Sequence, residues 1–147
     1  SGNVELIIAG TNTNTLRSGP KHAGVEKADD NGTLTISGFG TLNASGGESG
    51  AGIGGAWHKN ASNIVIEGGT IEANGGNWGA GIGGGQSAAG QNITIRDGNV
   101  TAIPVAKQQA LAAAFKVTAK TLPLRAARYM QSPAAETALL RPSAADE

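Results

Sequence analysis

The sequence predicts an all-β fold, a β-solenoid of about three to four coils with a short α-helical C-terminal cap or tail. Three observations lead to this prediction. A glycine-rich segment repeats at a fixed interval along the first two thirds of the chain. Within each repeat the apolar residues alternate with a period of two. Aromatic residues make up only 3% of the chain, too few for a conventional globular core.

The repeated segment is Gly-Ala-Gly-Ile-Gly-Gly, which occupies positions 50–55 and returns unchanged at positions 79–84. A degenerate copy begins at His22, close to one full repeat before the first of these. A fixed period of about 20 to 50 residues is the signature of a stacked repeat protein. We therefore expect residues 4–103 to hold about three and a half copies of one unit.

Apolar residues recur inside each unit at a spacing of two, which is the pattern of a strand with one buried face. Three such runs occur per unit, and glycine-rich corners separate them. This arrangement predicts one triangular coil, stacked on the next coil at about 4.8 Å. In this alignment Leu6 corresponds to Leu34, and Ile8 corresponds to Ile36. The three runs are Leu6/Ile8, Leu34/Ile36, Ile64/Ile66 and Ile93/Ile95; then Leu42/Ala44, Ile71/Ala73 and Val100/Ala102; then Ala51/Ile53 and Ala80/Ile82.

The third run is mostly glycine, which weakens a strand unless another backbone approaches it closely. We expect these glycines either to turn a corner with positive φ or to let neighbouring coils pack without side chains between them. The Ala and Ile residues between the glycines then point inward. Identical side chains in neighbouring coils are expected to stack in columns.

Composition excludes several classes of protein. The net charge of the 147 residues is zero, which implies no general attraction to nucleic acid. There is no cysteine, hence no disulfide framework, and no apolar run long enough to predict insertion into a membrane. The chain does not begin with a signal peptide, and we expect it to be a fragment of a longer secreted protein.

Composition changes near Ile103-Pro104, which predicts two domains: a β-solenoid repeat domain, 1–103, and an Ala-rich helical and partly disordered tail, 104–147. All 24 glycines lie at or before Gly98. The tail predicts a helix over about 105–120, ended by Pro123. This helix is expected either to cap the solenoid, whose last coil exposes unpaired strand edges, or to pack loosely as part of a neighbouring segment.

No catalytic or metal-binding constellation is found. The spacing Gly50-x-Gly52-x-x-Gly55 matches a dinucleotide fingerprint, but the helix and the later acidic residue of that motif are missing. The glycine segments carry no Asp, which calcium-binding glycine repeats require. The two histidines, His22 and His58, have no second ligand at a suitable spacing. The sequence predicts no catalytic residue, no metal site and no cofactor.

The candidate binding residues surround two tryptophans in polar, glycine-rich loops. Trp57 and Trp78 lie outside the alternating core positions, and an exposed Trp can stack on a sugar ring. The alternative is that each Trp folds over its own coil and covers the edge of the core, as large aromatic side chains usually do. The candidate carbohydrate contacts are Trp57, His58, Asn60, Asn77, Trp78 and Gln86.

The segments 32–55, 63–85 and 91–102 resemble glycine-rich repeats of large secreted or wall-attached proteins of Gram-positive bacteria. Those repeats are similar to right-handed parallel β-helices of the pectin-lyase-like type, and they often accompany carbohydrate-binding or adhesin-like domains. The resemblance covers residues 4–103 only. Pectin-degrading relatives use clustered Asp residues with Arg, Lys or His, and nothing here matches that motif.

The resulting hypothesis is a non-enzymatic extracellular β-helix module of a bacterium, secreted or at the cell surface. It acts as an adhesin-like scaffold that contacts a polysaccharide or a host-cell glycan, without nucleic acid or membrane insertion. One alternative is a fragment of a polysaccharide lyase or glycoside hydrolase, which needs two carboxylates across a cleft. A second alternative is an ice-binding solenoid, for which Thr35, Val65 and Thr94 share one frame but have charged neighbours.

Overall fold

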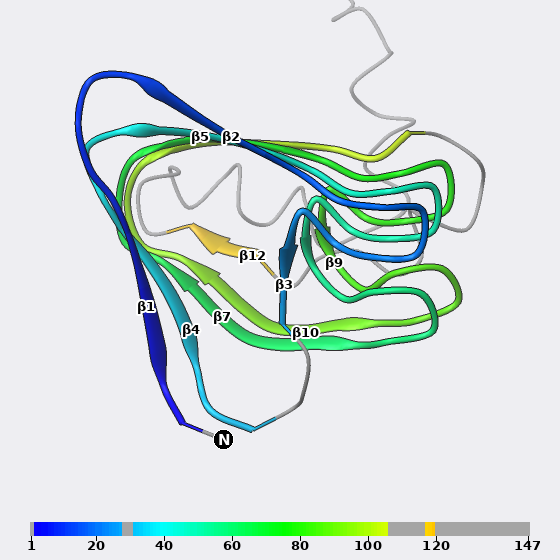
Figure 1. The fold of residues 1–147 in the computed structure, drawn as a ribbon. Coiled ribbons are helices and arrows are strands. Elements are labelled where there is room, and N and C mark those ends of the chain that lie inside the picture. The colour runs from blue at the N-terminus through cyan, green and yellow to red at the C-terminus, as the bar shows by residue number, and fades with distance from the viewer. Residues whose placement is uncertain (1, 28–30, 106–116, 120–147) are drawn as a thin grey trace, which may run out of the picture.

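The computed structural model describes residues 2–27, 31–105 and 117–119, and every regular element in them is a β-strand. The chain winds through three parallel sheets in turn and returns to the first sheet once per coil, as Figure 1 shows. The predicted all-β parallel solenoid is therefore confirmed. The first coil holds β1 (Val4–Ile8), β2 (Thr13–Arg17) and β3 (Val25–Glu26); the second holds β4 (Leu34–Gly38), β5 (Thr41–Ser45) and β6 (Ile53–Gly54); the third holds β7 (Ala61–Ile66), β8 (Thr70–Asn74) and β9 (Ile82–Gly83); and β10 (Gly90–Ile95) and β11 (Asn99–Ile103) begin a fourth.

Each strand pairs in parallel with the strand one coil later. The sheet orders are β1-β4-β7-β10-β12, where β12 is Val117–Ala119, then β2-β5-β8-β11 and β3-β6-β9. The register places Ile53 beside Ile82 and Ile66 beside Ile95, as the sequence repeat predicts. Segments one lap apart therefore lie directly on one another.

The core is a thin column of small aliphatic side chains from all three sheets. Alternation puts one side chain of every two inside, and the inner members of the second and third coils are buried. Identical or similar residues stack, because the register is kept from coil to coil. Those with no more than 2% exposure include Ile36, Leu42, Ala44, Ile53, Ile64, Ile66, Ile71, Ala73 and Ile82.

Glycine serves both of its expected purposes in the third run. Gly54 and Gly83 have φ of +133° and +143°, a region that side chains rarely adopt. Gly79 has ordinary φ, but a Cβ there would lie 1.9 Å from the carbonyl oxygen of Gly50 in the coil below. The backbones of successive coils are thus in direct contact at Gly79, and any side chain there would push them apart.

The first coil departs from the predicted alignment. Leu6 pairs with Ile36 and Val4 pairs with Leu34, so the predicted pairing of Leu6 with Leu34 was wrong by one step of the strand alternation. The corner between β1 and β2 uses residues 9–12, whereas residues 39–40 suffice between β4 and β5. This longer corner offsets the shift. β2 then pairs with β5, and β3 pairs with β6 as the glycine repeat predicts, with Val25 beside Ile53.

Two asparagines form a column at the start of the first sheet. Asn63 and Asn92 lie one coil apart with φ of 56° and 50°, values that are uncommon for residues other than glycine. The amide of Asn92 donates a hydrogen bond to Oδ1 of Asn63 at 3.1 Å. The column therefore fixes the same bend of β7 and β10 in both coils.

The predicted helix over 105–120 falls almost wholly outside the described residues. The exceptions are Val105, which lies in no helix or strand, and Val117–Ala119, which forms strand β12 and pairs in parallel with β10. The prediction of helix was wrong at these positions. A strand there supplies hydrogen-bonding partners that the open edge of β10 requires. The remainder of the predicted tail domain, and its boundary at 103/104, stay predictions.

The outward faces of the sheets carry polar and charged side chains together with some apolar ones, such as Ile7 and Val65. Glu67 and Arg96 form the predicted surface ion pair between neighbouring coils. Thr35, Val65 and Thr94 share one column, as predicted, and Glu5 stands at its first position. Neither the ion pair nor this column distinguishes carbohydrate binding from ice binding. Among the described residues no helix is long and apolar enough to cross a membrane.

Candidate functional site

The six candidate residues lie on two sets of stacked loops beside the third sheet. The loops that enter this sheet span 18–24, 46–52 and 75–81, and the loops that leave it span 55–60 and 84–89. Figure 1 shows both sets projecting on the same side of the solenoid, above and below β3 and β9. Because the coils keep register, each loop lies on its counterpart in the next coil.

Backbone hydrogen bonds join the two sets of loops with an offset of one coil. The amide of Trp57 donates to the carbonyl of Lys21 at 2.8 Å, and the amide of Gln86 donates to the carbonyl of Ser49 at 2.9 Å. The two bonds are equivalent, since Trp57 aligns with Gln86 and Lys21 with Ser49. The loops are therefore fixed against each other by the same geometry twice.

Trp57 presents the largest exposed aromatic surface in these loops. Its side chain is 41% exposed. The ammonium nitrogen of Lys21 lies 4.4 Å from the ring centroid, within range of a cation–π contact. The ring of His58 lies beside it, with centroids 4.5 Å apart and planes inclined at 47°. The indole thus contacts two neighbouring side chains while much of its surface stays open to solvent.

Polar groups continue this surface in the next coil. The hydroxyl of Ser49 and Oε1 of Gln86 are hydrogen-bonded at 3.0 Å. Trp78 follows one coil beyond Ser49, is half-buried, and donates its backbone amide to the carbonyl of Glu48. We call this set the tryptophan surface; it comprises Lys21, Ser49, Trp57, His58, Trp78 and Gln86.

Two candidate residues have different positions. Asn77 is exposed at the tip of its loop, next to Trp78. Asn60 lies at the far end of the loop from Trp57, and its side-chain oxygen accepts a hydrogen bond from the amide of Ala89 at 2.9 Å. Asn60 therefore joins two coils, which is a structural role, whereas Asn77 remains available at the rim.

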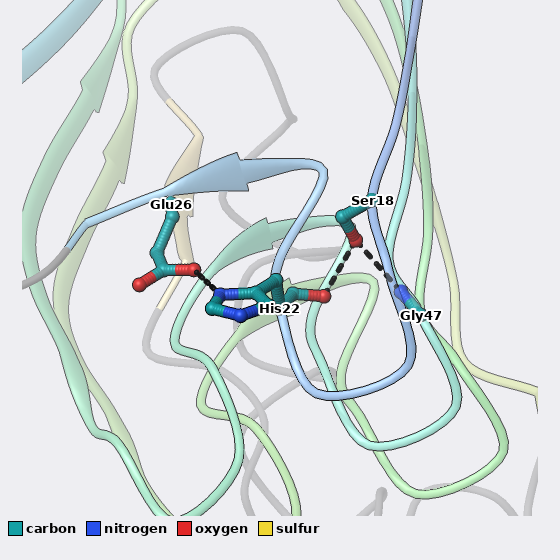
Figure 2. Close-up of polar contacts among 4 residues, drawn as sticks. All are labelled: Ser18, His22, Glu26 and Gly47. Atoms are coloured by element: carbon teal, nitrogen blue, oxygen red, sulfur yellow. Dashed lines mark hydrogen bonds and ion pairs between the residues drawn. The ribbon is translucent and has the colours of Figure 1, made fainter.

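A second polar cluster in the first coil, drawn in Figure 2, brings a serine, a histidine and a glutamate together without forming a hydrolytic triad. Nδ1 of His22 lies 2.9 Å from Oε2 of Glu26. The hydroxyl of Ser18, however, donates to the backbone carbonyl of His22 at 2.6 Å and accepts from the amide of Gly47 at 2.9 Å. A nucleophilic serine would need its hydroxyl on the imidazole ring. Ser18 instead ties two coils together.

The part of the chain that the structure describes also lacks a metal site and a dinucleotide site. No group of three or more His, Cys, Asp or Glu residues there is placed to hold a metal ion. The dinucleotide spacing at Gly50–Gly55 lies in buried backbone between coils and is followed by a loop and a strand, not by a helix. That geometry lacks the helix N-terminus that would face a pyrophosphate.

Comparison with known proteins gives one match. The family described as beta helix repeat matches residues 34–57 and 64–86, which is less than half of the chain. Each matched segment is one coil, from the first strand to the loop that carries Trp57 or Gln86. With the parallel sheets, this similarity supports a right-handed β-helix repeat. No curated protein and no solved structure matches significantly. The glycine-rich wall-attached type and the pectin-lyase-like class stay predictions.

Sequence reasoning did not find Lys21 or Ser49. Lys21, Ser49 and Trp78 occupy equivalent positions in successive repeats, so the repeat spacing alone is enough to align them. It does not reveal that the departing loop of one coil contacts the entering loop of the coil before. That contact depends on the shape of the glycine corners, which the spacing does not encode.

Proposed function

We propose that this chain is a non-enzymatic β-helix scaffold that acts outside the bacterial cell and binds carbohydrate through its tryptophan surface. The observation that carries the proposal is the indole of Trp57, fixed by Lys21 and His58 and 41% exposed. A rigid aromatic ring with polar neighbours suits a sugar, which has an apolar ring face and a polar rim of hydroxyl groups.

The neighbouring groups supply the polar contacts. Gln86 and Ser49 present an amide and a hydroxyl one coil from Trp57, and Asn77 adds a second amide beside Trp78. Coil stacking repeats these positions at about 4.8 Å along the solenoid. The columns hold different residues, Trp57 before Gln86 and Ser49 before Trp78, so an extended ligand would meet an aromatic ring in one coil and a hydrogen-bonding group in the next. This arrangement favours an oligosaccharide or polysaccharide over a single small sugar.

The scaffold part of the proposal rests on the repeat. Stacked coils form an extended, stiff surface whose loops project on one side, a form commonly used for binding. Among the described residues, the Ser18 hydroxyl bonds the backbone of His22 and not its ring, and no group of three or more candidate metal ligands comes together. A lyase or hydrolase assay, which detects new unsaturated or reducing ends in polysaccharides, separates this proposal from the enzyme alternative.

The direct test is binding to a glycan array, followed by titration of soluble polysaccharides. Trp57→Ala should remove most of the binding, because the stacking surface is lost. Gln86→Ala should weaken binding by about 2- to 10-fold, the equivalent of one hydrogen bond. Trp57→Phe leaves Trp78 as the only tryptophan for fluorescence and should keep part of the affinity.

Phe39→Ala is the matched control. Phe39 is a fully exposed aromatic residue at the corner between β4 and β5, outside the tryptophan surface. Its replacement should leave binding unchanged. If no glycan binds, or if Trp57→Ala and Phe39→Ala behave alike, carbohydrate binding at this surface is excluded and only the scaffold role remains.

A further inference from the structure

The connection from β3 to β4 contains an Asn-Gly pair that is exposed to water. Asn31 is an exposed residue, and Gly32 follows it directly. An asparagine can react with the peptide nitrogen that follows it, because this nitrogen can attack the side-chain carbonyl carbon and close a succinimide ring. Glycine obstructs the attack least, since it has no side chain beside the nitrogen. The pair therefore has the chemistry of a spontaneous modification site.

The attacking nitrogen of this pair is not engaged in a hydrogen bond. Within the part of the chain that the structure describes, the amide of Gly32 donates to no acceptor. The next amide, that of Thr33, is different, because it donates to Oδ1 of Asn3 at 2.9 Å. Attack by the nitrogen of Gly32 therefore breaks no hydrogen bond of the solenoid.

Lys27 contacts the same peptide group. Its side-chain nitrogen donates a hydrogen bond to the backbone carbonyl oxygen of Asn31 at 2.7 Å, and Lys27 is only 9% exposed. This carbonyl and the nitrogen of Gly32 belong to one conjugated peptide unit. When the nitrogen loses its proton, negative charge spreads onto the carbonyl oxygen, where the ammonium group stabilises it as a donor does in an oxyanion hole. Lys27 thus favours the reactive form of the nitrogen.

The second Asn-Gly pair, Asn74-Gly75, provides a contrast within the same chain. The amide of Gly75 donates to the carbonyl of Ile103 in the next coil at 2.9 Å. The side-chain nitrogen of Asn74 donates to Oε1 of Glu72 at 3.0 Å. The attacking nitrogen and the leaving group of this pair are both held by other partners, so reaction there requires the coil to open.

We propose that Asn31 is a site of self-modification, in which Lys27 assists attack by the nitrogen of Gly32. A bond forms between this nitrogen and Cγ of Asn31, the bond from Cγ to Nδ2 breaks, and Nδ2 leaves as ammonia with the proton from the attacking nitrogen. Water then opens the ring at either carbonyl and leaves aspartate or isoaspartate at this position. The product adds a negative charge, and the isoaspartate form lengthens the main chain between the first and second coils by a methylene group.

The test is incubation of the folded 147-residue chain at neutral pH, beside a sample unfolded in guanidinium chloride. Mass spectrometry of proteolytic fragments follows the conversion of each Asn-Gly pair. In the folded chain Asn31 should react at least about 10-fold faster than Asn74, because Asn74 must wait for local opening, and in the unfolded chain the two rates should agree within about 3-fold. Asn31 that stays intact in the folded chain while the unfolded chain reacts overturns the proposal, as do equal folded rates at the two sites.

Variants of Lys27 test its assistance. Lys27→Met removes the donor while keeping an unbranched side chain, and it should slow the reaction at Asn31 by about 3- to 10-fold, the equivalent of one hydrogen bond. Lys27→Arg keeps a charged donor and should retain most of the rate. Asn74 is the internal control, because its slow rate in both variants shows that the coils remain closed. An unchanged rate at Asn31 in Lys27→Met, or an equal loss in Lys27→Arg, overturns the assistance by Lys27.

Discussion

Asn63 and Asn92 show how single residues set the path of a coil. Both adopt positive φ, and their side chains hydrogen-bond to each other. Asn tolerates this conformation better than other residues that carry a side chain. Its side-chain amide also stabilises the column through the hydrogen bond between coils. The column therefore combines a backbone requirement with a contact between coils.

Replacement of Asn63 separates these two contributions. Asn63→Ala should lower the free energy of unfolding by about 1–3 kcal/mol, because it adds strain and removes a hydrogen bond. Asn63→Gly relieves the strain and should cost about 0.5–1.5 kcal/mol. Urea unfolding followed by circular dichroism measures both values. Equal losses for the two variants would show that φ is unimportant here.

Gly79 tests the close approach of neighbouring coils. Its added Cβ would collide with the Gly50 carbonyl, a backbone atom that cannot move alone. Gly79→Ala should therefore destabilise the fold by about 2–4 kcal/mol in the same unfolding experiment. Gly19→Ala is the control, since nothing lies within 4 Å of a Cβ there. Similar stabilities for the two variants would contradict the close packing of coils at Gly79.

At the scale of strands, burial decreases toward the end of the stack in one column of the first sheet. Ile36, Ile66 and Ile95 occupy one column, and Ile66 is fully buried while Ile95 is half-buried. Ile66 has a coil on both sides. The same side chain should therefore contribute more to stability in the third coil than in the fourth.

The pair Ile66→Ala and Ile95→Ala measures this gradient. Ile66→Ala should cost about 2–5 kcal/mol, the usual range for a buried isoleucine. Ile95→Ala should cost clearly less, because part of its side chain is already in water. Equilibrium unfolding in denaturant gives both values. A larger loss at Ile95 would contradict the order of the coils.

The strands also show what could be predicted from the sequence. The alternation in Ile64–Ile66 and Ile93–Ile95 gave both strands and their register, because nothing interrupts the repeat between them. The predicted alignment of Leu6 with Leu34 was wrong, because Leu6 pairs with Ile36, the next inward-facing residue of β4. Such a shift keeps the same side chains on the inner face, so hydrophobic pattern alone does not detect it. Only the longer corner at 9–12 resolves it.

At the scale of the whole molecule, the stacked coils place the tryptophan surface on the projecting loops. The sequence identified Trp57, Trp78 and Gln86 because they fall outside the core frame. It did not identify Lys21, whose position against Trp57 depends on a contact between loops of neighbouring coils.

The fold and the tryptophan surface both require coils that stack in register. Engineered disulfides test this register most directly. The chain has no cysteine, so a pair introduced on outward positions reports only its own distance. Thr41 and Thr70 are register partners in β5 and β8, whereas Asn99 lies one coil further. Adjacent strands lie about 4.8 Å apart, and disulfides join Cα atoms about 4.4–6.8 Å apart.

Oxidation of a Thr41→Cys/Thr70→Cys variant, followed by mass spectrometry of proteolytic fragments, should give an intramolecular disulfide in most molecules. The Thr41→Cys/Asn99→Cys and Thr41→Cys/Glu72→Cys variants should remain reduced, because one spans two coils and the other is out of register. Efficient cross-linking of either control, or its failure in the first variant, would contradict the stacking from which the fold and the tryptophan surface follow.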